Sequence, residues 1–173
     1  MAYDNPHGFT LVGASDDVKT LPLVVVSGTT VFSGDVVSEG ATSGTIKRAA
    51  AGDTVIGVCL DYIVGDGTKV AKIVVDPNAI FRVQVENGGS QLAATDVFSG
   101  FDIIAPAAPA TGRISNMELN DVAEVAGGQF ILVGRVNATE PYASGVLYTP
   151  AYGSNFVEAL VHFNVAETIW FQD

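Results

Sequence analysis

Short runs in which apolar and polar residues alternate dominate the chain from residue 21 onward. The clearest is 81–86, where three apolar side chains alternate with three polar ones. The run 157–165 has the same period of two, so both stretches predict strands with one buried face. Residues 129–134 are apolar at nearly every position, which is typical of a strand covered on both faces. Gly, Asp, Asn or Pro interrupts these runs at short intervals, a rhythm that predicts a single all-β domain, a barrel or a sandwich.

Five segments between the runs have the composition of turns or loops. Gly-Asp pairs at 34–35 and 52–53 each precede a strand, so the same turn chemistry is expected to begin both strands. Asn87-Gly88 and the Gly-Asp-Gly segment 65–67 favour tight hairpin turns. The proline-alanine stretch 103–111 is predicted to be a surface crossover, because proline cannot lie within a central strand.

One stretch carries a helix signal. Residues 115–118 (Ser-Asn-Met-Glu) fit a capping box, and apolar residues follow at roughly helical spacing before Gly127-Gly128. We therefore expect at most one short helix in the chain, between these points.

The first twenty residues differ from the rest because they show no sustained period. Residues 1–20 are predicted to form an extended N-terminal arm, and residues 21–173 a single all-β domain. Such an arm is either a frayed tail or docked on a neighbour, and Phe9, Leu11 and Val12 would allow it to dock. On this interpretation, removing the arm leaves the domain folded and weakens assembly.

The charged residues are too few for an ordinary soluble domain. They make up 16% of the 173 residues, whereas about 25% is average. A surface with so few charges is expected to be partly covered by a partner.

The balance of charge and the apolar runs exclude two classes of partner. The net charge of −11 would repel a phosphate backbone, so we expect no nucleic-acid binding. The longest aliphatic runs are far shorter than the ~18 residues of a membrane span, so we expect no membrane insertion. The start of the chain lacks the basic and apolar regions of a secretory signal, which predicts synthesis in a cytosol.

Groups that carry enzyme chemistry are scarce. His7, His162 and Cys59 are the only histidines and cysteine, which is too few for a zinc site. Cys59 lies in an apolar run and is expected in the core. The carboxylates lie mostly in turns or on outward positions of strands, where solvation explains them. We expect no catalytic residues, no metal, no cofactor and no enzyme activity.

Aromatic residues outside the predicted core are the best candidates for partner contacts. The segment 140–154 places three tyrosines among Ser, Gly and Pro, a composition that recognition surfaces use. The segment 168–173 includes two adjacent large aromatics, which either fold back onto the core or anchor a neighbouring subunit. The candidate interface residues are Phe9, Leu11, Val12, Tyr142, Tyr148, Tyr152, Trp170 and Phe171.

Three segments resemble the capsid cement, or head decoration, proteins of tailed bacteriophages. They are V-F-S-G-D-V-V at 31–37, G-T-I-K-R-A-A-A-G-D-T-V-I-G-V at 44–58, and I-V-V-D-P-N-A-I-F-R-V-Q-V-E at 73–86. Residues 131–136 and 157–164 are similar to later strands of that family. The proline-alanine stretch, the tyrosine segment and the aromatic tail depart from the family pattern.

The resemblance implies a non-enzymatic virion structural protein on the outer surface of the capsid. Such a protein binds the major capsid protein, often as a trimer, and stabilises the shell by bridging its subunits. The residues leave two alternatives open. One is a carbohydrate-recognition module of a phage tail or fibre, with tyrosines and Trp170 stacking on sugar rings. The other is a β-sandwich glycosidase, which would need two carboxylates held across a cleft.

Overall fold

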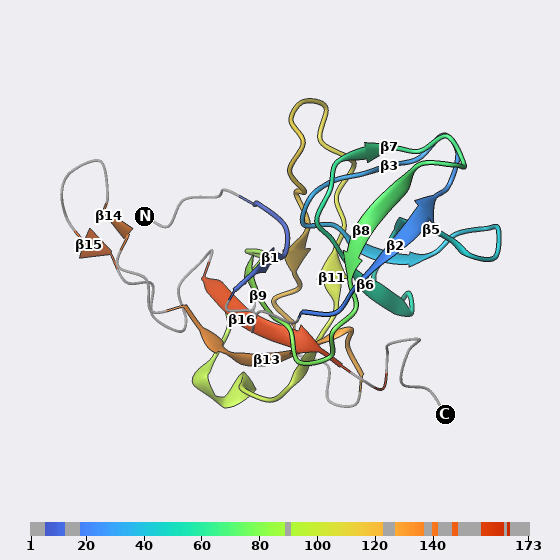
Figure 1. The fold of residues 1–173 in the computed structure, drawn as a ribbon. Coiled ribbons are helices and arrows are strands. Elements are labelled where there is room, and N and C mark those ends of the chain that lie inside the picture. Colours follow the sequence, from blue (N-terminus) through green and yellow to red (C-terminus); the bar gives the residue numbers. More distant parts are fainter. Residues whose placement is uncertain are drawn as a thin grey trace.

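The computed structural model describes residues 6–12, 18–88, 91–122, 127–136, 140–141, 147–148, 157–164 and 166. The fold is all-β, as the alternation of apolar residues predicts. Within the described part of the chain, the one helical element is a single 3₁₀ turn, η1 (Ala94–Asp96). The strands form two main units, a closed barrel and a five-stranded sheet (Figure 1).

The barrel is built from the first half of the chain. Its strands, in order around the barrel, are β2 (Thr20–Val25), β5 (Thr45–Arg48), β4 (Val36–Glu39), β6 (Val55–Cys59) and β8 (Val70–Val74). β2 and β5 run parallel and the other pairs are antiparallel. Small and aliphatic side chains fill the interior: Val25, Val31, Val37, Ile46, Ile56, Cys59, Ala71 and Ile73. Cys59 is thus buried in the core, as predicted.

The five-stranded sheet is antiparallel throughout. Its strands, in order, are β1 (Thr10–Leu11), β9 (Ile80–Gln84), β16 (Glu158–Phe163), β13 (Phe130–Arg135) and β10 (Gly100–Phe101). Five fully buried phenylalanines lie on its inner face: Phe9, Phe81, Phe101, Phe130 and Phe163. The Phe130 ring lies 4.5 Å from that of Phe9 and 5.4 Å from that of Phe163, measured between centroids.

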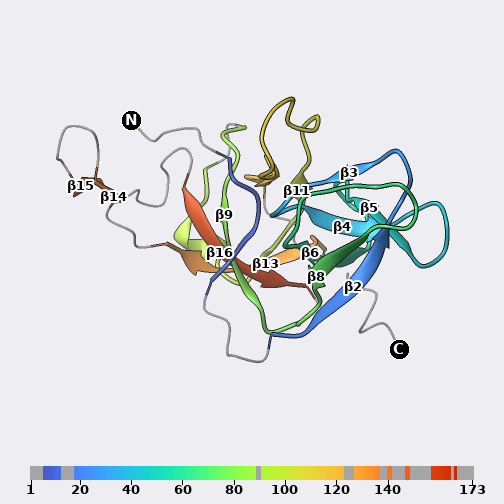
Figure 2. The same cartoon turned by 45° about the horizontal axis from the view of Figure 1, so that its top comes forward.

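Strands of the barrel contribute to both cores. Val36, Val58 and Val74 join the phenylalanine core, whereas their neighbours Val37 and Cys59 face the barrel interior. All five residues of β6 are buried. This two-sided burial joins the barrel to the sheet, and Figure 2 shows the two units side by side.

Three further strand pairs connect or extend these units. They are β3 (Thr30–Val31) with β7 (Ile63–Val64), β11 (Ile103–Ile104) with β12 (Glu118–Leu119), and β14 (Glu140–Pro141) with β15 (Leu147–Tyr148).

The strands predicted from alternation are confirmed. β9 buries Phe81 and Val83, and β16 buries Ala159, Val161 and Phe163, at every second position. The stretch 129–134 forms most of β13.

The two Gly-Asp segments form the same turn, as their sequence predicts. Gly34 has a φ of 90° and Gly52 a φ of 75° at the third position of each turn. In both turns the aspartate, Asp35 or Asp53, accepts a hydrogen bond from the amide three residues earlier. A positive φ at this position is typical of a type II turn, for which glycine is preferred.

The helix predicted from residue 115 does not begin there. The Ser115 hydroxyl accepts a hydrogen bond from the Met117 amide, 3.0 Å away, and Glu118 belongs to strand β12. The local Ser115 contact closes a short turn, which replaces the first turn of the expected helix. Residues 123–126 of that prediction lie outside the described residues.

The predicted hairpins at 65–67 and 87–88 are also wrong. The strand before residue 65, β7, pairs with β3, whereas the strand after it, β8, pairs with β2 and β6. β9, which precedes Asn87, pairs with β1 and β16. The segment 103–111 crosses the surface in part only, because Ile103 and Ile104 form β11 before the proline-alanine loop begins.

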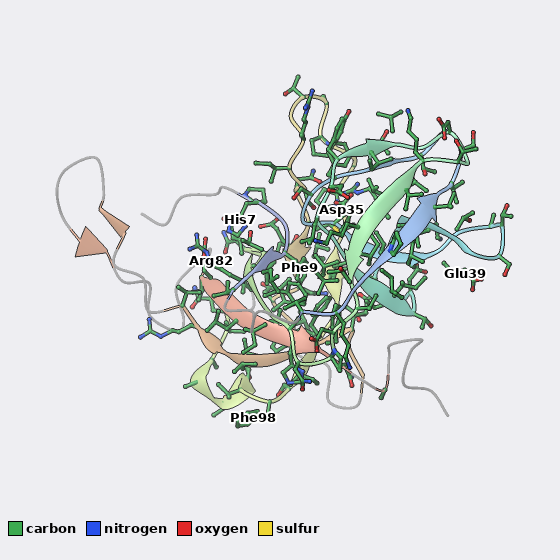
Figure 3. All side chains as sticks on the ribbon, viewed as in Figure 1. His7, Phe9, Asp35, Glu39, Arg82 and Phe98 are labelled. Carbon is green, nitrogen blue, oxygen red and sulfur yellow. The ribbon has the colours of Figure 1, made fainter. Side chains whose placement is uncertain are left out.

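The N-terminal segment is part of the fold. Residues 10 and 11 form β1, which pairs with β9 at the edge of the sheet. Phe9 is buried and stacks on Phe130 at an interplanar angle of 27°. Figure 3 shows Phe9 lying among the core side chains. We therefore expect removal of this segment to destabilise the sheet.

Candidate interaction surface

A small ribbon at one end of the barrel supports the most distinctive exposed side chains. β3 and β7 pair through Thr30 with Val64 and Val31 with Ile63. On the other side of β3, the Ser33 amide donates to the Arg113 carbonyl oxygen and the Ser115 amide donates to the Ser33 carbonyl oxygen. Three segments distant in sequence therefore lie side by side, at the top of Figure 1.

Tyr62, Val64 and Arg113 form what we call the barrel-end surface. The side chain of Tyr62 is 37% exposed and that of Val64 is 49% exposed, while Arg113 is exposed. Ile63, between the first two, packs against the barrel interior. Since successive strand residues point to opposite faces, Tyr62 and Val64 share the outer face.

Aromatic and cationic groups stack beneath and across this surface. The Tyr62 ring lies 5.4 Å from that of buried Phe32, and the Arg113 guanidinium carbon lies 5.5 Å from the Tyr62 centroid. On the other side of Phe32, the Arg48 guanidinium carbon lies 5.7 Å from its centroid. A ring between another ring and a cation has few alternative positions, so Tyr62 is held in place.

A buried ion pair fixes the base of this stack. The Arg48 Nε donates to Asp35 Oδ2 over 2.9 Å, its Nη1 donates to the Pro106 carbonyl oxygen, and its Nη2 donates to Asn116 Oδ1. One arginine thus joins the barrel to both ends of the proline-alanine loop that leads to Arg113. Figure 3 shows Asp35 near the base of this loop.

Burial and hydrogen bonding have opposite effects on the ionisation of Asp35. Burial raises the pKa of Asp35, although Ser115, Arg48 and the Phe32 amide each favour the ionised form. A buried carboxylate with these partners serves to hold the loop. The Asp35 carboxylate is buried beneath the stack and does not reach solvent.

The turn after Val64 is also fixed. Asp66 Oδ1 accepts hydrogen bonds from the Thr68 amide, the Thr68 hydroxyl and the Lys69 amide. These donors lower the pKa of Asp66 to about 2. Lys69 Nζ donates to the Val64 carbonyl oxygen and pairs with Asp66. The turn at the edge of the barrel-end surface therefore has a fixed conformation, and the charges of Asp66 and Lys69 are paired.

A second polar cluster lies on the outer face of the five-stranded sheet. Glu158 on β16 pairs with the Arg82 guanidinium on β9 and accepts from His7 Nε2, 3.0 Å away. Burial of Glu158 opposes its ionisation, but His7 and Arg82 outweigh this and lower its pKa. This cluster ties the N-terminal segment to the sheet (Figure 3). The charged groups of this cluster pair with one another, so a structural role explains the cluster best.

The structure places the sequence-predicted contact residues in different environments. Phe9 is buried, which contradicts its predicted role as an exposed contact. Leu11 is partly buried against the phenylalanine core. Val12 is 36% exposed at the edge of the sheet. These three residues therefore do not form one exposed surface.

The remaining predicted contacts are largely outside the described residues. Tyr142, Tyr152, Trp170 and Phe171 fall outside, and Tyr148 lies in β15, which pairs with β14. Their roles stay predictions.

Sequence reasoning missed the barrel-end surface because its residues are far apart along the chain. Tyr62 and Arg113 meet only through the pairing of β3 with β7 and the bridge between Ser33 and Ile114. A signal was present in the loop 105–117, in which Arg113 is the only charged residue among prolines and alanines.

Other kinds of site were sought in the described residues. No group of three or more His, Cys, Asp or Glu side chains there could hold a metal ion. None of the helices in the described part combines the length and apolar character needed to cross a membrane. The Cys59 thiol is buried, and burial raises its pKa to about 12.

Comparison with known proteins adds no family to this description. No protein-family model, no curated protein and no solved structure matches the chain.

Proposed function

We propose that this protein is a non-enzymatic virion structural protein, a head decoration subunit that binds the outer surface of a phage capsid. In this role it bridges subunits of the major capsid protein and stabilises the shell. It is synthesised in the host cytoplasm and acts on the assembled particle.

The barrel-end surface is the observation that carries the proposal. Tyrosine and arginine side chains are enriched in the centres of protein interfaces, where a few residues supply most of the binding energy. Here Tyr62 and Val64 stand exposed at the β3–β7 ribbon, and Arg113 stands exposed on the neighbouring loop that Arg48 ties to the barrel. A preorganised surface loses little conformational freedom on binding, which favours a protein partner.

The segments that resemble cement proteins also support the proposal. Residues 31–37 and 44–58 supply β4, β5 and β6 of the barrel, and 73–86 supply β9 of the sheet. The resemblance therefore falls on the framework that joins the barrel to the sheet.

Binding to capsids tests the proposal directly. Purified full-length protein is mixed with expanded capsids that lack it, and the bound copies per particle are measured after sedimentation. We expect saturable binding, and at least a tenfold loss of retention for Tyr62→Asp. The matched control is Val122→Asp, because Val122 is 50% exposed and lies outside the barrel-end surface.

The result that would overturn the proposal is an absence of binding to such capsids by the folded wild-type chain. Binding to a glycan array in place of capsids would instead favour the carbohydrate-recognition alternative.

A further inference from the structure

Phe98 is the most exposed large apolar side chain among the described residues. It is 77% exposed and has a φ of 72°, in the left-handed region that bulky residues rarely adopt. Figure 3 shows it pointing away from the body of the protein, at the end opposite the barrel-end surface. An exposed aromatic held in an unfavourable backbone conformation suggests a role that requires its position.

The loop around Phe98 is fixed rather than loose. The Ala93 amide donates to Asp96 Oδ2 over 2.7 Å, and the Ser99 amide donates to the Asp96 carbonyl oxygen. The Phe98 amide donates to the Leu132 carbonyl oxygen of β13. Val97, next to it, packs against the phenylalanine core. The loop therefore presents Phe98 in one orientation.

The loop that carries Phe98 and the loop that carries Arg113 have opposite charges. Asp96 is the only charged residue between 91 and 101, and Arg113 is the only one between 105 and 117. Neither forms an ion pair within the described part of the chain. Each charge has an exposed large side chain beside it. Phe98 lies two residues from Asp96 in the chain, and the Tyr62 ring centroid lies 5.5 Å from the Arg113 guanidinium carbon.

From this complementarity we propose that the barrel-end surface of one copy of this chain binds the Phe98 loop of a second copy. Phe98 packs between Tyr62 and Val64, and Asp96 approaches Arg113. An aromatic anchor at the centre, with polar and charged groups at the rim, is the usual arrangement of a protein interface. The inference rests on the proposed function and deepens it. The protein partner of the barrel-end surface is then a second copy of the chain, and capsid retention depends on this surface because the assembled ring carries several shell-binding subunits.

The arrangement dictates the symmetry of the assembly. The two contact regions lie at opposite ends of the molecule, so each copy offers one region to a preceding copy and the other to a following copy. A contact of this head-to-tail kind closes into a ring when the rotation between copies allows it. A ring would then carry several shell-binding subunits, which multiplies their retention on the capsid.

The mass of the protein in solution tests this inference separately from the proposed function, because the measurement is made without capsids. Light scattering on the full-length wild-type chain is expected to give an oligomer, and Phe98→Asp or Val64→Asp alone a monomer. The control Val122→Asp is expected to keep the wild-type mass. An equimolar mixture of Phe98→Asp and Val64→Asp chains retains one intact contact per pair, so it is expected to form dimers and nothing larger.

Cysteine crosslinking supplies the second measurement. A chain with both Phe98→Cys and Val64→Cys is oxidised and analysed without reductant, and we expect covalent oligomers beyond the dimer. Each single variant is expected to stay uncrosslinked. Native Cys59 does not compete, because it is buried.

Two outcomes overturn the inference. One is a monomeric wild-type chain, and the other is efficient dimer formation by Phe98→Cys alone, which would place two Phe98 loops against each other. A monomer that still binds capsids leaves the proposed function standing. A chain that crosslinks as expected and ignores capsids contradicts only the proposed function.

Discussion

The barrel and the five-stranded sheet bury their apolar residues in different ways. The barrel interior is filled by small and β-branched side chains, to which each of its five strands contributes one or two. The sheet covers its inner face with five phenylalanines, and Phe130 contacts three of the others. A closed barrel of this size is filled by aliphatic side chains, whereas an open sheet needs large aromatic ones to reach the opposing layer.

This difference predicts where the protein is sensitive to mutation. In the barrel each side chain contributes a modest share of the core. In the sheet a single ring contacts several others, so its loss leaves a large cavity that neighbours fill incompletely.

Phe130→Ala should have the largest effect. Removing the ring that contacts Phe9, Phe81 and Phe163 is expected to lower the free energy of unfolding by about 4 kcal/mol. Urea denaturation followed by circular dichroism measures the change. If Phe130→Ala does not fold, Phe130→Leu gives the same test with a smaller cavity. A loss no larger than that of a barrel valine would contradict the comparison.

Phe9→Ala tests whether the N-terminal segment belongs to the sheet. We expect a loss of about 3 kcal/mol, because the ring is fully buried and stacks on Phe130. Val12→Ala is the matched control, since Val12 is partly exposed at the end of the same segment, and should change stability little. Equal stabilities for the two variants would show that the segment is a dispensable arm.

Ile73→Val probes the barrel interior. This substitution removes one methylene from a fully buried site and is expected to cost about 1 kcal/mol. The urea midpoint should shift without a change of slope. A loss as large as that of Phe9→Ala would mean that the barrel depends on single residues as the sheet does.

Glu158→Gln tests the outer face of the sheet and should have the smallest effect. Because the Glu158 pKa is lowered in the folded state, its stabilisation is present above the ordinary value of 4.5 and is lost as the pH falls. We expect Glu158→Gln to cost about 1 kcal/mol or less at pH 7. The difference from wild type should shrink at pH values well below 4.5. A difference that does not change with pH would contradict the ionic explanation.

The sequence predicts the strands better than their partners. The alternation in 81–86 and 157–165 predicts their strands because Phe81 and Val83 in β9, and Ala159, Val161 and Phe163 in β16, are buried at every second position. Their pairing with each other is set by packing across the whole chain, which a local pattern does not contain. The prediction of a hairpin at Asn87-Gly88 was wrong for this reason.

Local polar contacts explain why the helix predicted from residue 115 is wrong. Ser115 and Glu118 have the spacing of a capping box, yet the Ser115 hydroxyl closes a two-residue turn and Glu118 enters β12. The barrel-end surface could not be predicted from the sequence either, because the fold alone brings Arg113 beside the Tyr62 ring. Phe98 gave no periodic signal, because it lies in a loop outside the strands, where its φ is 72°.

The order of strands along the chain also sets an order of events during synthesis on the ribosome. The barrel uses residues 20–74 alone, so it can close soon after Val74 has left the exit tunnel. The sheet places β9 between β1 and β16, and β16 is synthesised after all the other strands. Until β16 emerges, Phe81 and Phe130 lack the strand that lies between them. A nascent chain stalled before residue 158 should therefore carry a folded barrel and exposed phenylalanines, a species that chaperones would bind.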